Sequence, residues 1–139
     1  MNADWSDVGF EQWLLELESL RERDFVLAAS IAKNYVTPGE AADMAEAISR
    51  TGPDIVTLVD YDAEDLLRAV KLARPRVSQP MMVKLCPFMP RLEETLQELV
   101  KAGIDGVAVM DSIGPVLSID VETGMPNMGS ADGLSLIHI

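Results

Sequence analysis

The chain has 139 residues, of which 48% are hydrophobic and 24% are charged, and this balance is typical of a globular protein with one ordinary core. Its formal net charge of −12 excludes the basic surface that binding to nucleic acid or to an anionic membrane requires, so we expect neither partner. The single cysteine, Cys86, excludes an internal disulfide, and no apolar run approaches the length of a membrane span, so we expect a cytoplasmic protein.

The first part of the chain predicts a helix, a strand and a second helix. Apolar residues recur at helical spacing at Phe10, Trp13, Leu14, Leu17 and Leu20. We expect Ser6 or Asp7 to cap this helix. The apolar run Phe25–Ala32 predicts a strand. Thr37 then supplies an N-cap, Pro38 a first helical residue and Glu40 the partner of a capping box, so a helix begins there and ends at Gly52.

The same alternation continues for the rest of the chain up to Asp111. Strand patterns occupy Ile55–Val59, Met81–Cys86 and Gly106–Met110, and helix patterns run from Asp62 to Pro75 and from Leu92 to Gly103. Short loops between such units require parallel strands with right-handed crossovers.

An internal repeat supports this organisation. The segment 52–60 and the segment 103–111 each contain a helix-ending glycine, an aspartate two residues later, five strand residues and a second aspartate. A doubly wound sheet and a barrel both satisfy the alternation. The even spacing of strands, about 25–30 residues apart, favours the barrel. We therefore predict an α/β fold, a partial TIM (β/α)8 barrel of about four parallel units with a hairpin after the last strand, formed by residues 1–133.

Residues 134–139 are interpreted separately. Their sequence, Leu-Ser-Leu-Ile-His-Ile, looks like the translation of a transposon end used in preparing sequencing libraries, so we expect an artefactual tail and assign its His138 no role. We also expect the natural protein to carry opening strands before Met1 and to continue beyond Gly133.

Four polar residues, Ser30, Asp60, Lys84 and Asp111, lie near the ends of the four predicted strands. Lys84 is the most informative, because a lysine inside an apolar strand requires a wet cleft or an anionic partner. It either faces a ligand inside the barrel or forms a structural ion pair with a carboxylate of a neighbouring strand. The aspartates suit a site, and they equally suit helix caps and solvated loops. We assign no metal site.

Several motifs resemble dihydroorotate dehydrogenases and related flavin-dependent barrel enzymes. Val83–Pro87 resembles the family's valine-lysine-leucine-serine-proline strand, and Asp111–Gly114 with Ile119–Thr123 is similar to its asparagine-serine loop and following hairpin. Val8–Leu14 resembles an early helix of the family. The resemblance covers roughly residues 8–128, the middle of a family member, and the motifs occur in the family's order. The glycine-rich loops that hold the flavin phosphate would follow Gly133.

The resemblance implies an FMN-dependent oxidoreductase of the kind found in pyrimidine metabolism, which transfers hydride between a small cyclic substrate and the flavin. The candidate site residues are Lys84 and Ser30 for the cofactor, Asp111 and Ser112 for the substrate, and, from their positions in this chain, Asp60 and Cys86 for proton transfer. Cys86 can equally be a packing residue. The open-edged chain by itself is expected to be inactive, and the sequence leaves a homodimer of the full-length form open.

The departures from the family predict a different substrate. Ser30, Asp60 and Asp111 stand where the family has asparagines or an asparagine-containing loop. An ionised aspartate only accepts hydrogen bonds, so a substrate with N–H donors or a positive charge is expected in place of dihydroorotate. The alternative is a non-redox barrel protein that binds a phosphorylated or pterin-like metabolite through Lys84.

Overall fold

The computed structural model describes residues 8–32, 36–86, 88–109 and 119–124. The elements in chain order are α1 (Phe10–Ser19), β1 (Ala28–Ala32), α2 (Pro38–Thr51), β2 (Ile55–Val59), α3 (Ala63–Ala73), the short 3-10 helix η1 (Arg74–Arg76), β3 (Met81–Leu85), α4 (Leu92–Lys101) and β4 (Gly106–Val109). Helices and strands therefore alternate as the sequence predicts.

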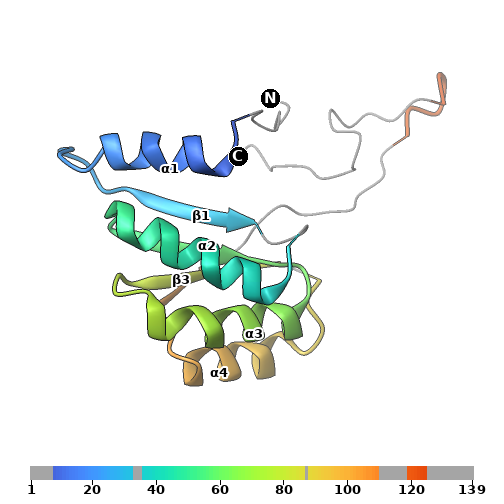
Figure 1. Cartoon of the computed structure of the whole chain (residues 1–139). Coiled ribbons are helices and arrows are strands. Elements are labelled where there is room, and N and C mark those ends of the chain that lie inside the picture. The colour runs from blue at the N-terminus through green and yellow to red at the C-terminus, as the bar shows by residue number, and fades with distance from the viewer. Residues whose placement is uncertain (1–7, 33–35, 87, 110–118, 125–139) are drawn as a thin grey trace.

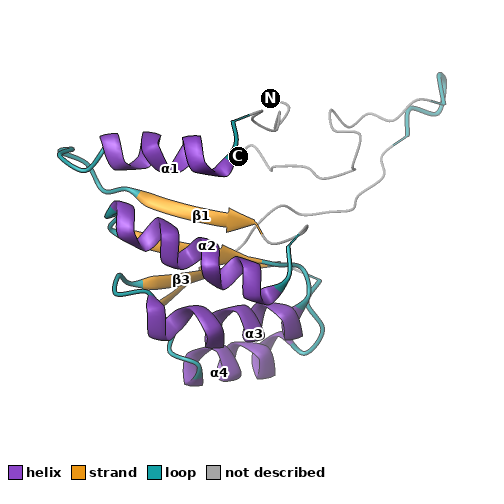
Figure 2. Ribbon diagram, viewed as in Figure 1, coloured by secondary structure: helices purple, strands orange, loops and turns teal. Residues whose placement is uncertain are grey.

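The strands form one parallel sheet in the order β1-β2-β3-β4. Helices α2, α3 and α4 lie side by side over the same face of this sheet, and α1 continues their row beyond α2 (Figure 1; Figure 2). A doubly wound sheet reverses its strand order at a switch point and places helices on both faces. In the wall of a barrel, strands pair in chain order and a single layer of helices covers one face. The fold is therefore an α/β partial barrel.

The register divides the strand residues between two faces. The helix-facing core residues of the sheet are Ala29, Ile31, Val56, Leu58, Met81, Val83 and Leu85, all at most 3% exposed. They pack against buried helix residues that include Ile48, Leu66, Val70 and Leu99. The opposite face, which we call the inner face, carries Ala28, Ser30, Ala32, Ile55, Thr57, Val59, Met82, Lys84, Gly106 and Ala108. Burial of the helix-facing side chains holds the two layers together.

The helix starts confirm the predicted cap at Thr37 and the predicted start of a helix at Asp62. Thr37 forms a capping box with Glu40, and Asp62 accepts a hydrogen bond from the N–H of Asp65 at the start of α3. The prediction for α1 was wrong, because its N-cap is Gly9, which has no side chain to accept a hydrogen bond.

The first strand is shorter than the predicted run. β1 begins at Ala28, and the preceding Phe25 and Val26 are 53% and 74% exposed. The reason lies in the partner strand, since β2 begins at Ile55 and its first residue pairs with Ala28. Apolar composition alone did not reveal where the partner strand starts.

The two Gly-x-Asp repeats have the same structural role at the amino ends of the strands. The N–H of Asp54 donates to the carbonyl of Leu27 (2.9 Å), while the N–H of Leu27 donates to Oδ2 of Asp54 (2.8 Å). Asp105 and Met81 form the same reciprocal pair, with both distances 2.8 Å. The first aspartate of each repeat, Asp54 or Asp105, therefore joins its strand to the preceding strand at the start of their parallel pairing.

An arginine completes each of these arrangements. Arg23 pairs with Asp54, and Nη1 of Arg74 lies 3.0 Å from Oδ2 of Asp105. We call these the amino-end clamps. The glycines of the repeat, Gly52 (φ 86°) and Gly103 (φ 99°), adopt the left-handed conformation that ends each helix beside its clamp.

Two sequence predictions fall on residues outside this description. The tail at 134–139 and the first three residues of the hairpin, 116–118, lie outside the described residues. Within 119–124, Asp120 accepts hydrogen bonds from the N–H groups of Glu122 and Thr123, which lower the pKa of its carboxyl. Among the described residues, no helix combines the length and apolarity needed to cross a membrane.

Candidate functional site

The candidate site lies at the carboxyl ends of the strands, where Lys84 projects from β3. In the register, Lys84 is opposite Val59 of β2 and Ala108 of β4, and it lies on the inner face with its side chain partly exposed. Met82 lies on the same face as Lys84, as the alternation of side chains along a strand requires. The lysine therefore points away from the helical layer, toward the space that a barrel encloses.

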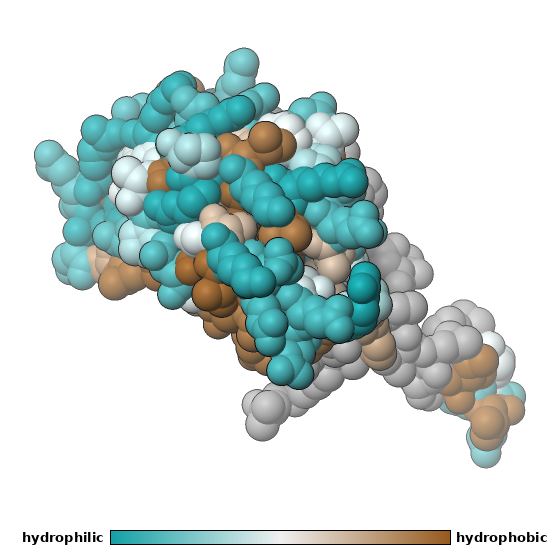
Figure 3. All heavy atoms as spheres, turned by 90° about the horizontal axis from the view of Figure 1, so that it is seen from below, coloured by the Kyte–Doolittle hydropathy of each residue, from teal (hydrophilic) through white to brown (hydrophobic). Residues whose placement is uncertain are grey.

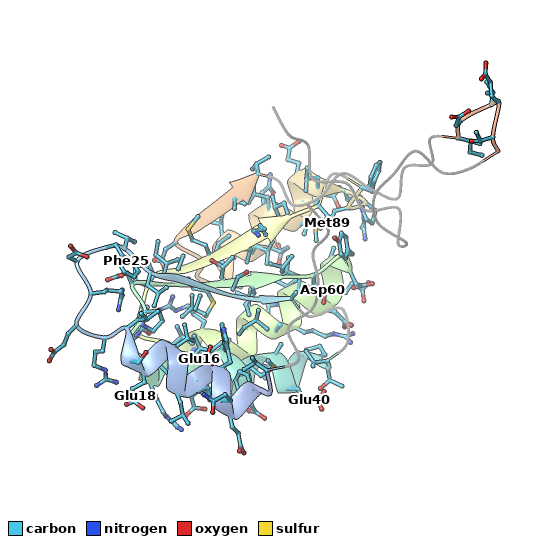
Figure 4. The ribbon with its side chains drawn as sticks, turned by 90° about the horizontal axis from the view of Figure 1, so that it is seen from above. Glu16, Glu18, Phe25, Glu40, Asp60 and Met89 are labelled. Atoms are coloured by element: carbon cyan, nitrogen blue, oxygen red, sulfur yellow. The ribbon has the colours of Figure 1, made fainter. Side chains whose placement is uncertain are left out.

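Asp60 follows Val59 directly and is 5% exposed. Its Oδ1 accepts a hydrogen bond from the N–H of Asp62 (2.9 Å), and Asp62 in turn caps α3. These local bonds turn the chain from β2 into the helix and hold the Asp60 carboxylate beside the end of the strand. Figure 4 shows Asp60 and Met89 at one end of the strands and Phe25 at the other.

Cys86 joins the ends of β2 and β3. Its thiol donates to the carbonyl oxygen of Asp60 over 3.7 Å, and the residue is 2% exposed. The strand ends at Leu85, so the alternation that would place Cys86 on the face of Lys84 stops one residue earlier. The structure thus brings Asp60, Lys84 and Cys86 to adjacent strand ends, and the role of Cys86 in proton transfer stays a prediction.

Ser30 lies deeper than the sequence suggested. It is the central residue of β1, not a residue of its carboxyl end, and it is exposed on the inner face. In the register it shares a level with Thr57 and Met82, whereas Ala32 shares the level of Lys84. Strand geometry puts the backbones of Ser30 and Lys84 roughly 12 Å apart. They can contact different parts of one extended ligand, but not each other.

The inner face around Lys84 is lined by small side chains. Ala32 and Ala108 lie at the level of the lysine, and Ser30 and Gly106 lie one level below. A Cβ added at Gly106 would lie 3.4 Å from the side chain of Met82. The small side chains nearest the lysine are therefore Ala32 and Ala108, while the Met82 side chain lies over Gly106.

The two substrate residues implied by the resemblance, Asp111 and Ser112, lie outside the described residues. β4 ends at Val109, so they follow the strand next to Lys84 in the chain. Their assignment stays a prediction.

A hollow between the starts of α3 and α4 was not foreseen. It has a volume of about 320 Å³ and is lined by Tyr61, Asp62, Ala63, Glu64, Leu67, Pro90, Arg91, Glu94, Thr95 and Glu98. A hydrogen bond from Lys101 lowers the pKa of the Glu98 carboxyl. In the sequence, the acidic residues of this lining are typical of the solvent-exposed faces of two helices. No sequence signal distinguishes such exposed faces from a hollow between the helices.

Comparisons with known proteins agree with this geometry. No family model matches the chain. The catalytic subunit of dihydroorotate dehydrogenase B (NAD⁺) from Methanothermobacter thermautotrophicus is 29% identical over 117 residues. The match covers 79% of this chain and 35% of that protein. This supports a relationship to an oxidoreductase of the dihydroorotate dehydrogenase kind.

A solved structure shows the fold. Phosphoenolpyruvate phosphomutase from Streptomyces platensis subsp. rosaceus, a TIM barrel, superposes with a TM-score of 0.54 at 15% identity. The superposition covers 73% of this chain and 44% of that one. The fold is part of a TIM barrel. The chain thus spans between about a third and a half of the length of the proteins it matches.

Proposed function

We propose that this chain forms the central part of an FMN-dependent oxidoreductase that transfers hydride between a small cyclic substrate and the flavin. The observation that carries the proposal is Lys84, partly exposed on the inner face at the carboxyl end of β3. Active sites of TIM-barrel enzymes are found at this end of the strands. The similarity to a dihydroorotate dehydrogenase catalytic subunit supplies the reaction class.

The residues around Lys84 fit a flavin. A flat ring needs an apolar floor and a cation near the atoms that gain negative charge on reduction. Val59 and Ala108 flank Lys84 in the register, and both are small enough to let a ring approach its ammonium. When bound, FMN supplies the hydride acceptor. The role of Lys84 is to place a positive charge at the ring's N1 and O2 edge, and the role of Ser30 is to donate a hydrogen bond to a more distant part of the cofactor.

Asp60 is the proposed proton-transfer group. Its carboxylate is held at the end of β2, one residue beyond the partner of Lys84 in the register. A carboxylate at this position accepts hydrogen bonds and repels anions. The proposed substrate is therefore a small cyclic compound with N–H donors or a positive charge, different from dihydroorotate.

A second candidate function follows from the same lysine. An ammonium beside small side chains can also bind a phosphate, which is a non-redox use of the inner face. The phosphomutase likeness supports only the fold that both functions share, because the identity is 15%. Under this alternative, a phosphorylated or pterin-like metabolite occupies the inner face and no flavin is retained.

The test uses a chimaera in which this chain replaces the matched segment of the Methanothermobacter enzyme, so that the rest of a barrel is present. Flavin content of the purified chimaera is measured by absorbance, and reduction of the flavin is followed with dihydroorotate and with neutral and cationic cyclic amides. We expect bound FMN, and faster reduction by the amides than by dihydroorotate.

Lys84→Met should lower the flavin content or the rate of reduction, because it removes the cation and keeps the length of the side chain. Lys101→Met, on a residue whose side chain is 69% exposed on α4, is the matched control and should change neither. A folded chimaera that retains no FMN and binds phosphate esters through Lys84 would favour the second function. Unchanged flavin content and reduction in Lys84→Met would remove the lysine from the cofactor site.

A further inference from the structure

The acids that line the hollow between α3 and α4 already have partners among the described residues. Glu94 pairs with Arg91 (3.5 Å), Glu98 pairs with Lys101 (2.8 Å), and Asp62 caps α3. Seen from the side on which α4 lies, hydrophilic side chains cover most of the surface, with smaller apolar patches between them (Figure 3). The hollow therefore belongs to the solvated outer surface of the helices, on the side of the sheet away from the inner face.

One row of the inner face lies directly below Lys84. The register places four residues at this level, two positions before Lys84 along its strand: Ser30 of β1, Thr57 of β2, Met82 of β3 and Gly106 of β4. A strand rises about 3.3 Å per residue, so the row lies roughly 7 Å below the backbone of the lysine. Met82 has the longest side chain of the row, and it therefore determines the shape of the surface beneath Lys84.

The side chain of Met82 lies across the start of β4. A Cβ built on Gly106 would lie 3.4 Å from both Cγ and Cε of Met82 and 3.7 Å from its Sδ. The thioether is thus in contact with the place where any other residue of β4 would have its Cβ. Met82 is nevertheless partly exposed, whereas Met81 and Val83, on the helix-facing side of β3, are fully buried. One side of the thioether therefore packs on β4, and the other remains accessible from the inner face.

A thioether in this position is suited to contact a planar ring. Methionine combines three rotatable side-chain bonds with a polarisable sulfur, and contacts between sulfur and aromatic rings are favourable. A ring that reaches the ammonium of Lys84 extends over the row below it, because Lys84 and Met82 lie on the same face of one strand.

We propose that Met82 is a further cofactor-binding residue, whose thioether forms the surface beneath the flavin ring while Lys84 contacts the edge of the ring. Gly106 is a positioning residue: because it has no side chain, Met82 can lie across β4 and leave the space above it to the ring. This inference rests on the proposed function, since it names another contact of the same cofactor. It divides the work of β3 between a lysine that supplies charge and a methionine that supplies apolar contact.

The first test measures the dissociation constant of FMN from the chimaera described above, by titrating the FMN-free protein and following flavin fluorescence. Met82→Ala should weaken FMN binding about three- to tenfold, because a sulfur–ring contact is lost. Met44→Ala is the matched control. Met44 is also partly buried, but it lies on α2 and packs against the helix-facing core. Its substitution should lower stability and leave the dissociation constant unchanged.

Gly106→Val tests the positioning role. Valine suits a strand, but its methyl groups extend toward the Met82 side chain, so the displaced thioether should enter the space of the ring and weaken FMN binding about tenfold. In the double variant with Met82→Ala and Gly106→Val, the side chain that would be displaced is gone. The double variant should therefore bind FMN no more weakly than Met82→Ala alone. A loss equal to the sum of the two single losses would mean that Gly106 acts independently of Met82.

The second test needs no substitution. Hydrogen peroxide converts an accessible methionine to its sulfoxide, and mass spectrometry of the digested chimaera measures the rate at each methionine. Met82 should be oxidised at least about fivefold more slowly with FMN bound than after FMN has been removed, because the ring covers its sulfur. The rate at Met44 should be the same in both forms. This test decides the question even if the substituted proteins fail to fold.

The outcomes separate this inference from the function on which it rests. A chimaera that binds no FMN would overturn the proposed function and, with it, the role of Met82. A chimaera that binds and reduces FMN would overturn the role of Met82 alone in either of two cases. In the first, Met82→Ala leaves the dissociation constant unchanged; in the second, Met82 is oxidised equally fast with and without FMN.

Discussion

The two ends of the sheet use the same residue type for different purposes. At the amino ends, Asp54 and Asp105 form reciprocal hydrogen bonds with the preceding strand and pair with arginines. At the carboxyl ends, Asp60 is buried beside the strand that carries Lys84. The comparison teaches that an aspartate in this repeated motif is structural where its carboxylate accepts a hydrogen bond from a backbone N–H of the preceding strand. Asp60 is a site candidate because it directly follows Val59, the residue opposite Lys84 at the carboxyl end of the sheet.

Removing the arginine of the first clamp should have the largest effect on stability. Arg23 donates to the carbonyls of Leu20 (3.1 Å) and Gly52 (3.3 Å) and pairs with Asp54, and its side chain is 7% exposed. Arg23→Met should therefore lower the free energy of unfolding by about 2–3 kcal/mol, since several bonds are lost in a buried position. Urea denaturation at one fixed protein concentration measures this.

The control for Arg23 is Arg68→Met on α3. Its side chain is 66% exposed and its carboxylate partners lie 3.7 and 3.8 Å away. We expect a change within about 0.5 kcal/mol. Equal losses of unfolding free energy in the two variants would show that the amino-end clamp stabilises the fold no more than an exposed ion pair does.

Gly103→Ala should have the second largest effect. Gly103 has φ 99°, and a Cβ there would lie 3.2 Å from Cγ of Arg74, the arginine of the second clamp. We expect a loss of about 1–2 kcal/mol from backbone strain and displacement of that arginine. The same substitution at Gly39, in the first turn of α2, meets no side chain or backbone atom closer than 3.9 Å and should be neutral or slightly stabilising. Thermal unfolding of both variants measures these changes in stability. A Gly103→Ala protein as stable as the unmodified chain would contradict the role of this glycine in ending α4 beside the second clamp.

Lys84→Met should change stability little. The side chain is partly exposed on the inner face and is not part of the helix-facing core. We expect a change within about 0.5 kcal/mol in urea denaturation. A loss comparable to that of Arg23→Met would mean that Lys84 is a structural ion-pair residue, which is the alternative that the sequence left open.

The smallest predicted effect is a pH dependence at the first clamp. Hydrogen bonds from the backbone of Leu27 and then from Arg23 lower the pKa of the Asp54 carboxyl below its ordinary value of 3.8. A lowered pKa means that the unfolded chain binds the proton more tightly, so this contribution to stability is present above pH 3.8 and is lost as the pH falls through the lowered value.

Asp54→Asn keeps an acceptor for Leu27 but removes the titration. Its stability should therefore fall less steeply between pH 5 and pH 3 than that of the unmodified chain, as measured by urea denaturation across that range. Lys84→Met, which leaves the clamp intact, should keep the steeper dependence. Parallel profiles for Asp54→Asn and the unmodified chain would argue against the assigned cause.

Local sequence signals were sufficient to predict the order of the helices and strands. The capping box at Thr37 and the cap at Asp62 act within a few residues of the chain, so their sequence signals predicted both helix starts. The apolar strand around Lys84 was predicted for a similar reason, because six residues between prolines, five of them apolar, have few alternatives to a buried strand.

The tertiary structure decided what depends on contacts between distant segments. The sequence left the barrel and the doubly wound sheet open, and the order of the strands with one helical layer resolved this. It also placed Ser30 at mid-strand and started β1 at Ala28, because pairing with β2 determines where β1 begins. The repeat was visible in the sequence, but it did not show that Asp54 and Asp105 join strands while Asp60 directly follows the strand that pairs with β3. That difference arises because parallel pairing brings residues more than 20 positions apart into hydrogen-bond contact, and local sequence carries no record of the partner.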